Sequence, residues 1–494
     1  MNMKKTILLL LLAGLLTMQT VSCGAPAAEE TGTASVTDPT ETAAEETVPE
    51  TTPLEAMGAA DFGGKTYTIL DANDHPYMHI NMHIGETNGE PINDAIYNRD
   101  QIIADNYNTV IAYEQTEPCK PGATAFQNNV IAGDETYSMI IGPALGSGIA
   151  SLANAGVLFN LNSLSDGKDA NWANPWWSAL MYDTMQLNGK FLYTTGDIAS
   201  SVYQAPFCVF YNVDMGLDYG YEAADIYEMV RNGEWTYTEL FAMTRDMNAD
   251  LNGDNAWTHL DDFAGIIIQK GKDTTNALLT SCGVHMSEID AEGNLVVDLN
   301  NEFVMTAAEM LHTLYDPTFE YSDNKDPTHR MFPEARGLFM IHKVETATAA
   351  LREMEDDFAI LPMPKYDAAQ DGYNHLLSGW VDCFIGLPKN LTDTEFAGFV
   401  TEALARASYT LIRPAAFETT LKGKTARDAE SLAMLDIIFD TLYLDFNCLN
   451  DFGSICDKIS TSLIAGQGLA SVFASTDSAV QSAIDKVTEV YSQE

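Results

Sequence analysis

The sequence has few basic residues for its length. Its 494 residues include 25 Lys and Arg against 71 Asp and Glu, which gives a formal net charge of −46 at pH 7. A chain this acidic repels the phosphates of nucleic acid and of anionic lipid, so we exclude both as main partners. After the N-terminal segment no apolar run reaches the length that spans a bilayer, which excludes an integral channel.

Cysteine pairs and catalytic motifs are also missing. The six cysteines after Cys23 form no Cys-x-x-Cys pair and no spacing typical of zinc sites. Most lie in apolar surroundings, so we expect buried free thiols, or at most one bridge between Cys448 and Cys456. The chain contains no G-x-S-x-G, H-E-x-x-H or phosphate-loop motif. Paired carboxylates for glycoside hydrolysis stay open, because an acidic chain supplies many candidates.

The N-terminus has the features of an export signal. A basic pair at residues 4–5 precedes an apolar run at residues 7–16, which is too short to cross a membrane. Cys23 follows a small residue and precedes glycine, and this segment resembles the lipobox of bacterial lipoproteins, with Thr20 where that pattern usually has Leu. The resemblance implies a signal peptide at residues 1–22 and a lipid on the Cys23 thiol.

Residues 23–56 are expected to form a tether. After Cys23 they are almost wholly Ala, Thr, Glu, Pro, Gly, Ser and Val, with no aromatic residue. Such a segment cannot bury enough apolar surface to offset its ordering entropy, so we expect a solvated acidic linker between the lipid and a folded body. The alternative is an ordinary signal peptide cut near Ala25 or Ala27.

Strand and helix patterns alternate along the body. We expect strands at residues 65–70 and 137–141, and helices at 91–106, 391–405 and 479–490. Thr392 and Glu395 form a capping-box pattern at the start of the fourth of these segments. Strands that alternate with helices over this length favour α/β layers with parallel or mixed sheets.

A series of short motifs then follows in a fixed order. They lie at residues 188–193 (NGKFLY), 210–212 (FYN), 233–240 (GEWTYTEL), 337–340 (GLFM), 358–364 (FAILPMP), 414–417 (PAAF), 427–428 (RD) and 434–436 (MLD). From about Phe62 to the C-terminus, this series resembles the carbohydrate-type extracellular solute-binding lipoproteins of ABC importers.

The resemblance implies two α/β lobes of the periplasmic-binding-protein type, joined by crossing strands, with a ligand cleft between them. Crossings are then expected near residues 198–203 and 375–380, with a third after Met434. The lobes would be divided as 57–198 and 376–440 for lobe 1, 199–375 for lobe 2, and 441–494 as a helical segment mainly of lobe 2.

Candidate ligand contacts follow from this arrangement. Sugar rings stack their C–H faces on Trp or Tyr, and Asp accepts hydrogen bonds from their hydroxyls. Trp380 and Asp382 fall at the second crossing, and Tyr203 falls near the first. Trp177 offers a further aromatic ring beside Trp176, although most large aromatic residues, such as Trp235, are expected in the core.

Two loops are expected to border the cleft. The Gly146-Ser147-Gly148 turn follows a predicted strand and exposes backbone N–H groups, so Ser147 is a candidate ligand contact, with a plain tight turn as the alternative. His75 lies in the loop after the first strand, where the resemblance places residues of the cleft. His75, His79 and His83 are spaced by four, but Pro76 interrupts the helix that a shared metal would need.

Residues 250–261 resemble a calcium loop. Oxygen-bearing side chains stand at positions 1, 3, 5, 9 and 12 of the loop, with Asn255 where such loops have Gly and an Asp where they end in Glu. The alternatives are a structural Ca²⁺ and a solvated acidic loop; no other cofactor is expected. The candidate ligands are Asp250, Asn252, Asp254, Thr258 and Asp261.

The leading hypothesis is a monomeric, lipid-anchored, extracytoplasmic protein that captures a small solute for an ABC permease. By the resemblance, the solute is a sugar or oligosaccharide and the protein is not an enzyme. The alternatives are a surface glycoside hydrolase and a surface protein that holds glycan or peptide without transport.

Overall fold

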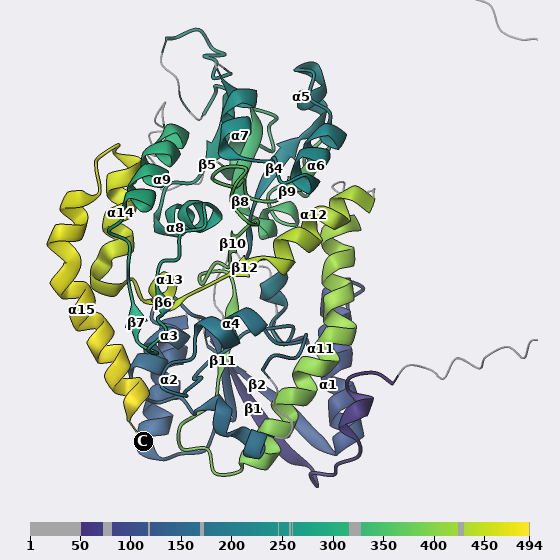
Figure 1. Ribbon diagram of the computed structural model, residues 1–494. Helices are drawn as coiled ribbons and strands as arrows, with labels where there is room; N and C mark the ends of the chain where they lie inside the picture. The colour runs from purple at the N-terminus through teal and green to yellow at the C-terminus, as the bar shows by residue number, and fades with distance from the viewer. Residues whose placement is uncertain are drawn as a thin grey trace, which may run out of the picture. The chain divides into compact units, whose positions relative to one another are not determined.

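Two four-stranded sheets organise the chain from Thr51 onward (Figure 1). The structure is a computed structural model, and it describes residues 51–72, 82–116, 119–167, 172–245, 247–255, 258, 260–315, 328–422 and 429–493. Within the described residues, no helix is both long enough and apolar enough to cross a membrane.

The first sheet has the strand order β11-β3-β1-β2. Its strands are β1 (Lys65–Asp71), β2 (Thr109–Gln115), β3 (Met139–Pro143) and β11 (Cys383–Gly386). β1 pairs in parallel with β2 and β3, whereas β11 runs antiparallel to β3. Both strands that the sequence predicted here are confirmed, the second with a later start.

Helices α1 and α11 lie side by side on one face of this sheet (Figure 1). The Tyr67 side chain of β1 points to that face, where its hydroxyl lies 2.7 Å from the Thr401 hydroxyl. We call this sheet and its helices lobe 1. The helices are α1 (Pro91–Tyr107), α2 (Cys119–Ala132), α3 (Ile149–Asn154), α4 (Ala179–Thr184) and α11 (Thr394–Lys422).

The start of α11 differs from the prediction. The helix begins at Thr394 and runs to Lys422 with Pro414 inside it. Asp393 rather than Thr392 caps it, because the Asp393 carboxylate accepts the Phe396 N–H at 3.2 Å. The Thr392 hydroxyl instead donates to the Glu135 carboxylate at 2.8 Å. The capping box was therefore placed one residue too early.

The second sheet has the order β5-β8-β4-β9 and mixes parallel and antiparallel pairs. Its strands are β4 (Phe207–Asn212), β5 (Ala264–Ile268), β8 (Gly337–Lys343) and β9 (Phe358–Leu361). Trp235 is fully buried beside it, as expected, and its indole N–H donates to the Pro362 carbonyl at 2.9 Å.

Helices surround this second sheet, and together we call them lobe 2. They are α5 (Val213–Asp218), α6 (Ala223–Arg231), α7 (Tyr237–Thr244), α8 (Lys272–Ser281), α9 (Glu302–His312), α10 (Thr328–Met331), α12 (Ala429–Asp440) and α14 (Ile455–Ile464). α12 contacts β9 and α6, and Glu430 on it pairs with Arg231. The sequence analysis expected residues 376–440 in lobe 1. The structure instead places α12, the last helix of that range, in lobe 2.

Within the described residues, three short segments cross between the lobes, and the chain also passes from α11 of lobe 1 to α12 of lobe 2. The first crossing contains the short turn η3 (Ser200–Tyr203) and leads into β4. The other two contain β10 (His375–Leu376) and β12 (Leu442–Tyr443), which pair in parallel. A bridge between Pro206 and Leu377 joins the first two crossings. The hinge is therefore a bundle of short, mutually hydrogen-bonded segments.

His375 shows how closely these crossings are packed. Its ring is fully buried, with Nε2 accepting the Met363 N–H at 2.9 Å and Nδ1 beside the Thr441 hydroxyl at 2.7 Å. Burial lowers the pKa of His375 to about 3, because the charged ring would lose its hydration. The imidazole is neutral and serves the hinge as a structural hydrogen-bonding group.

The remaining elements lie beside the crossings. They are β6 (Glu288–Ile289), β7 (Leu295–Val296), α13 (Phe446–Asn450), η6 (Phe452–Ser454) and α15 (Ala470–Ser492). α15 contains the helix predicted at residues 479–490 and begins earlier. All five cysteines whose side chains are described are buried and free, which confirms the first of the two predicted states. They are Cys208, Cys282, Cys383, Cys448 and Cys456.

Candidate functional site

The carboxyl ends of β1, β2 and β3 meet at the edge of the first sheet that faces the crossings. In open α/β sheets, this edge is where ligands usually bind. Asp71 ends β1 there, almost buried, and accepts a hydrogen bond from the Gln115 amide at 3.2 Å. The sequence reasoning missed Asp71, although its position directly after the predicted strand at residues 65–70 could have indicated it.

The loop after β3 is shaped by its glycines. Gly146 and Ser147 both have positive φ, of 69° and 72°, and both are exposed. A Cβ on Gly148 would lie 1.8 Å from the Pro143 carbonyl oxygen, so no other residue fits there. The predicted turn after the strand is present, and it leads directly into α3, which starts at Ile149.

Trp380 lies on this loop. A Cβ added to Gly146 would come within 2.9 Å of the Trp380 ring, which places the indole directly over that glycine. The Leu145 N–H donates to the Gly379 carbonyl at 3.2 Å and joins the loop to the second crossing. The fold thus brings the two predicted contacts Ser147 and Trp380 together from distant parts of the sequence.

Trp380 is more exposed to solvent than any other tryptophan that the structure describes. Its side chain is 37% exposed, whereas the other described tryptophans are 8% exposed or less. A large aromatic surface at a sheet edge loses contact with water when a ligand covers it. Trp380 is therefore positioned to bind an apolar ring face.

Asp382 does not present its carboxylate beside Trp380. It is fully buried, and its Oδ1 accepts the Ser201 hydroxyl at 2.9 Å. Ser201 in turn accepts the Cys383 N–H at 2.8 Å. Burial raises the pKa of Asp382 to about 7, against the hydrogen bonds, which lower it. The prediction of a ligand contact is corrected: Asp382 joins two crossings.

Tyr203 also belongs to the hinge. It is 5% exposed, its hydroxyl donates to Asp197, and its ring packs on Phe417 and Phe439 with centroids 5.5 and 6.0 Å away. Burial raises the pKa of Asp197 to about 7, while Tyr203 and Arg413 lower it. At this low exposure Tyr203 offers a ligand little surface, so its predicted role as a ligand contact is corrected.

Trp177 is buried in lobe 1 together with Trp176. Their indole N–H groups donate to the two oxygens of the Glu402 carboxylate, at 2.8 and 2.9 Å. Arg406 donates to the same carboxylate at 2.8 Å. Trp177 is 4% exposed, so its predicted role as a ligand contact is corrected: it satisfies a buried Glu instead.

The predicted histidine contact cannot be placed. His75 and His79 lie outside the described residues. His83 stacks on Tyr113, with ring centroids 4.3 Å apart. Among the side chains that the structure describes, no group of three or more His, Cys, Asp or Glu is arranged to hold a metal ion.

The loop at residues 250–261 is closed by its own hydrogen bonds. Asp250 accepts the Gly253 and Asn255 N–H groups at 2.6 and 2.7 Å. Asp261 accepts the Thr258 hydroxyl at 2.5 Å and the Asn252 amide at 2.8 Å. Asn255 has a φ of 64°, the left-handed conformation that a calcium loop needs at this position.

A charged pair beside the second crossing was not predicted. Ser378 donates to Asp273 at 2.7 Å, and the same carboxylate lies 3.9 Å from the Lys343 ammonium. Lys343 also lies 5.2 Å from the Phe207 ring centroid. Asp273 is in the first turn of α8 and Lys343 ends β8, so only tertiary contacts place them together.

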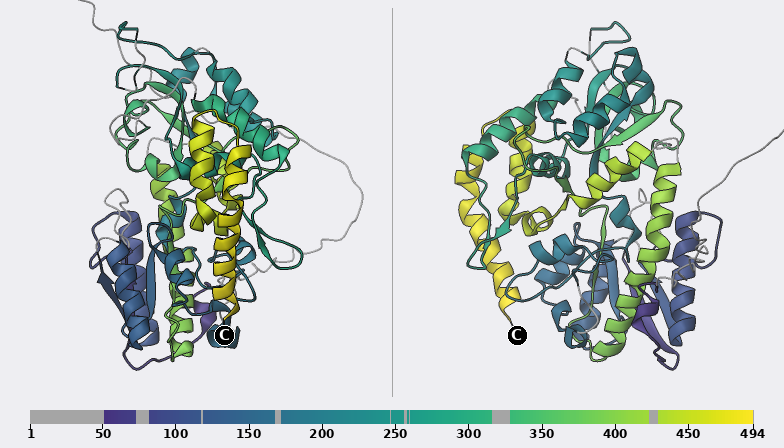
Figure 2. Two further views of the ribbon diagram at one scale, coloured as in Figure 1. Left: turned by 90° about the vertical axis from the view of Figure 1, so that its left-hand side faces the viewer. Right: turned by 45° about the vertical axis from the view of Figure 1, so that its right-hand side comes forward.

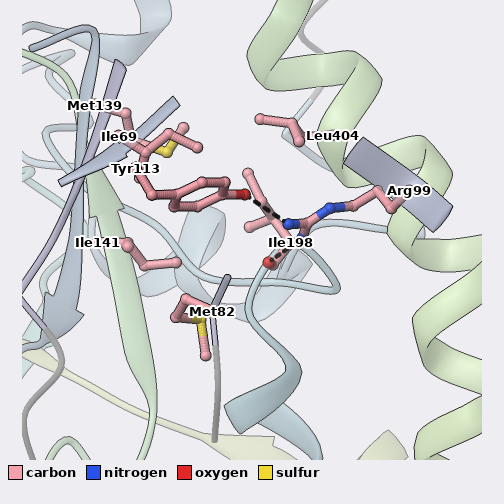
Figure 3. A pocket seen from close by; sticks show the side chains of 8 residues that line it. All are labelled: Ile69, Met82, Arg99, Tyr113, Met139, Ile141, Ile198 and Leu404. Atoms are coloured by element: carbon pink, nitrogen blue, oxygen red, sulfur yellow. Dashed lines mark hydrogen bonds between the residues drawn. The ribbon is translucent and has the colours of Figure 1, made fainter. Parts of the chain in front are cut away.

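A small cavity lies inside lobe 1 (Figure 3). Its volume of about 10 Å³ holds about one water molecule. Arg99 borders it and donates to the Tyr113 hydroxyl at 2.8 Å and to the Ile198 carbonyl at 3.2 Å. A sugar does not fit in this cavity. The hydrogen bond from Arg99 to Ile198 joins α1 to the first crossing.

Two solved structures resemble the chain over most of its length. UspC of M. tuberculosis has a TM-score of 0.55 at 11% identity, covering 85% of this chain and 100% of its own. A cyclo/maltodextrin-binding protein complexed with maltotetraose has a TM-score of 0.54 at 11% identity, covering 87% of this chain and 96% of its own. At such low identity the likeness concerns the fold, which is the two-lobe fold of periplasmic binding proteins.

The sequence alone matches neither a known protein family nor a curated protein.

Proposed function

We propose that this protein is an extracytoplasmic substrate-binding protein that captures a carbohydrate and delivers it to an ABC permease. Three features support the proposal: the two-lobe fold, its similarity to a protein complexed with maltotetraose, and the order of motifs along the sequence. Trp380, exposed at the hinge edge of lobe 1, is the observation that carries it.

The proposed site uses Trp380 as a platform. The C–H face of a sugar ring stacks on the indole, while the Ser147 hydroxyl and the exposed backbone of Gly146 bond its hydroxyl groups. Ser147 and Gly146 come from lobe 1, and Trp380 comes from the second crossing. Lobe 2 therefore covers the ligand from the other side when the lobes rotate. His75, which follows β1, stays a proposed contact.

The proposed tether completes the function. A lipid on Cys23 and the acidic segment up to residue 56 would keep the body near a permease in the same membrane. The protein acts as a monomer in this scheme, since one body with one site suffices for delivery. It needs no cofactor, with Ca²⁺ in the 250–261 loop as a stabilising addition.

A thermal-shift screen tests the carbohydrate ligand. Maltotetraose, shorter maltodextrins, monosaccharides and a set of peptides are added to the full chain, with and without Ca²⁺. A ligand that binds only the native state raises the melting temperature by mass action. We expect at least one sugar to do so.

Two outcomes contradict the proposal. If peptides raise the melting temperature and sugars do not, the carbohydrate assignment fails while the fold stands. If the purified protein cleaves a glycan, the protein is an enzyme that uses paired carboxylates.

A further inference from the structure

The last helix connects the two lobes away from the hinge. α15 runs from α14, beside lobe 2, to α3 of lobe 1, and Figures 1 and 2 show it along one side of the molecule. Its 23 residues span about 35 Å at the rise of an α-helix. The sequence analysis expected residues 441–494 mainly in lobe 2, so the contact of this helix with lobe 1 is a finding of the tertiary structure.

The first half of α15 is held firmly on the lobe-2 side. Val472, Phe473 and Val480 are buried, and the helix contacts α14 and η6. Gly453 in η6 lies so close that a Cβ on it would be 2.7 Å from the Val480 nitrogen. Such close backbone packing makes α15 move with η6 and α14 as one piece.

The last turn of α15 rests on lobe 1. Tyr491 is 1% exposed, and its pKa is raised by burial and by the neighbouring Tyr193 hydroxyl. Val490 contacts the backbone just after α3, because a Cβ on Gly156 would lie 3.8 Å from its methyl group.

Four polar residues then close this contact, and we call them the C-terminal clip. The Asn188 amide donates to the Ser492 hydroxyl at 2.9 Å, and the Lys190 ammonium donates to the Gln493 carbonyl. Asn188 and Lys190 belong to a tight turn of lobe 1, in which Leu187 and Lys190 exchange backbone hydrogen bonds. Asn188 has a φ of 53°, the left-handed conformation that Asn adopts more readily than most residues.

We propose that the C-terminal clip sets the balance between lobe arrangements, by holding the end of α15 on lobe 1 until the lobes rotate. The three crossings are close together and permit a rotation about themselves. A rigid helix fixed to one lobe and resting on the other must slide or detach during that rotation. The clip therefore adds its free energy to the arrangement in which it is made.

The end of α15 also contacts the helix that follows the candidate site. α3, which the end of α15 contacts, begins directly after the loop that supports Trp380. Asn154 at the end of α3 donates to Asn450 of α13 at 2.7 Å. A change at the C-terminus thus reaches the ligand platform through one short helix, whatever the ligand is.

Distance measurements by double electron–electron resonance test the proposal without a ligand. Spin labels are placed on V110C of lobe 1 and L217C of lobe 2, both at exposed positions. Cys23 and Cys119 are replaced by Ser in the full chain, and the described native cysteines are buried. The release variant is N188G/K190M, in which Gly tolerates the positive φ and Met keeps the length of Lys. The control is K486M, an exposed position on α15.

We expect the release variant to show a shifted distance distribution or a second population, and the control to match the parent. If the release variant folds normally by circular dichroism and its distribution superimposes on that of the parent, the proposal is overturned. It is also overturned if K486M shifts the distribution to the same extent, since the effect would then belong to the helix in general.

Discussion

Trp380 and Trp177 illustrate how differently one residue type behaves in this protein. Both were candidate stacking rings, but the indole N–H of Trp177 has a buried carboxylate partner at 2.8 Å, whereas Trp380 keeps 37% of its side chain exposed. Partner and exposure depend on neighbours far apart in the chain. They make Trp177 structural and leave Trp380 as the proposed ligand contact.

Replacing Trp380 by Ala should weaken sugar binding. Loss of the stacking platform is expected to cost about 1–3 kcal/mol, by analogy with ring stacking on nucleic-acid bases. Isothermal titration with the best sugar from the thermal-shift screen measures it. The matched control is Y219A, an aromatic residue of lobe 2 that is 50% exposed. Unchanged affinity in W380A, with a lower melting temperature, would show that the indole only supports the Gly146 loop.

Asp382 makes the stability depend on pH. Its pKa is about 7 in the folded state, against an ordinary value of 3.8, so the folded protein holds the proton that the unfolded chain releases. Its contribution to stability is complete below about pH 4, falls as pH rises to about 7, and is then constant. Asp197 also has a pKa of about 7, so its ionisation likewise lowers the unfolding free energy as the pH rises.

The variant D382N should flatten this decline. The amide cannot ionise, so its unfolding free energy, measured by urea titration between pH 4 and pH 8, should exceed that of the parent most clearly at pH 8. The gain is on the order of 4 kcal/mol at most, from three pKa units at 1.36 kcal/mol each. Parallel pH profiles for D382N and the parent would mean that the Asp382 carboxyl does not titrate in this range.

At the scale of single elements, α11 shows where pattern reasoning falls short. The helix itself was predicted, and Val400, Ala403 and Leu404 on its inner face are fully buried. The cap was predicted at the wrong residue. Thr392 and Asp393 are both good capping residues, and only the hydrogen bond of Thr392 to Glu135 prevents the Thr392 side chain from capping the helix.

The cap of α11 can be tested by three substitutions. D393A should lower the unfolding free energy by about 1 kcal/mol, because the Phe396 N–H loses its acceptor. T392A should change it by less than about 0.5 kcal/mol. K65M removes the exposed ion pair with Asp393 but keeps the cap, so it should also have a small effect. An effect of K65M as large as that of D393A would assign the stability to the ion pair.

The acidic loop at residues 250–261 is a second local element with its own prediction. If it binds Ca²⁺, the cation offsets clustered carboxylates, and millimolar Ca²⁺ should raise the melting temperature. D250N should abolish the rise, whereas D290N, in an acidic turn of another part of the chain, should leave it intact. No difference between Ca²⁺ and Mg²⁺, or between the two variants, would contradict a specific site.

At the scale of the whole molecule, the proposed lipidation of Cys23 would keep the body at a membrane surface. We expect the parent protein to fractionate with membranes and to carry an acyl-modified N-terminal Cys23 by mass spectrometry. C23S should be released in soluble form, with its melting temperature unchanged, because the folded unit begins at Thr51. An unmodified N-terminus in the membrane-free fraction of the parent would remove the tether and leave the binding function intact.

The sequence by itself determined the acidic composition, and it predicted the class of the fold through alternating strands and helices and an ordered motif series that indicated two lobes. These features depend on local periodicity and composition, which a single chain displays directly. The tertiary structure decided which candidates meet. In the folded chain Trp380 lies on the Gly146 loop, and Asp382, Tyr203 and Trp177 are buried. Helix α15 contacts elements of both lobes. The physical reason is that burial and hydrogen-bond partners depend on segments hundreds of residues apart, whose approach no local pattern records.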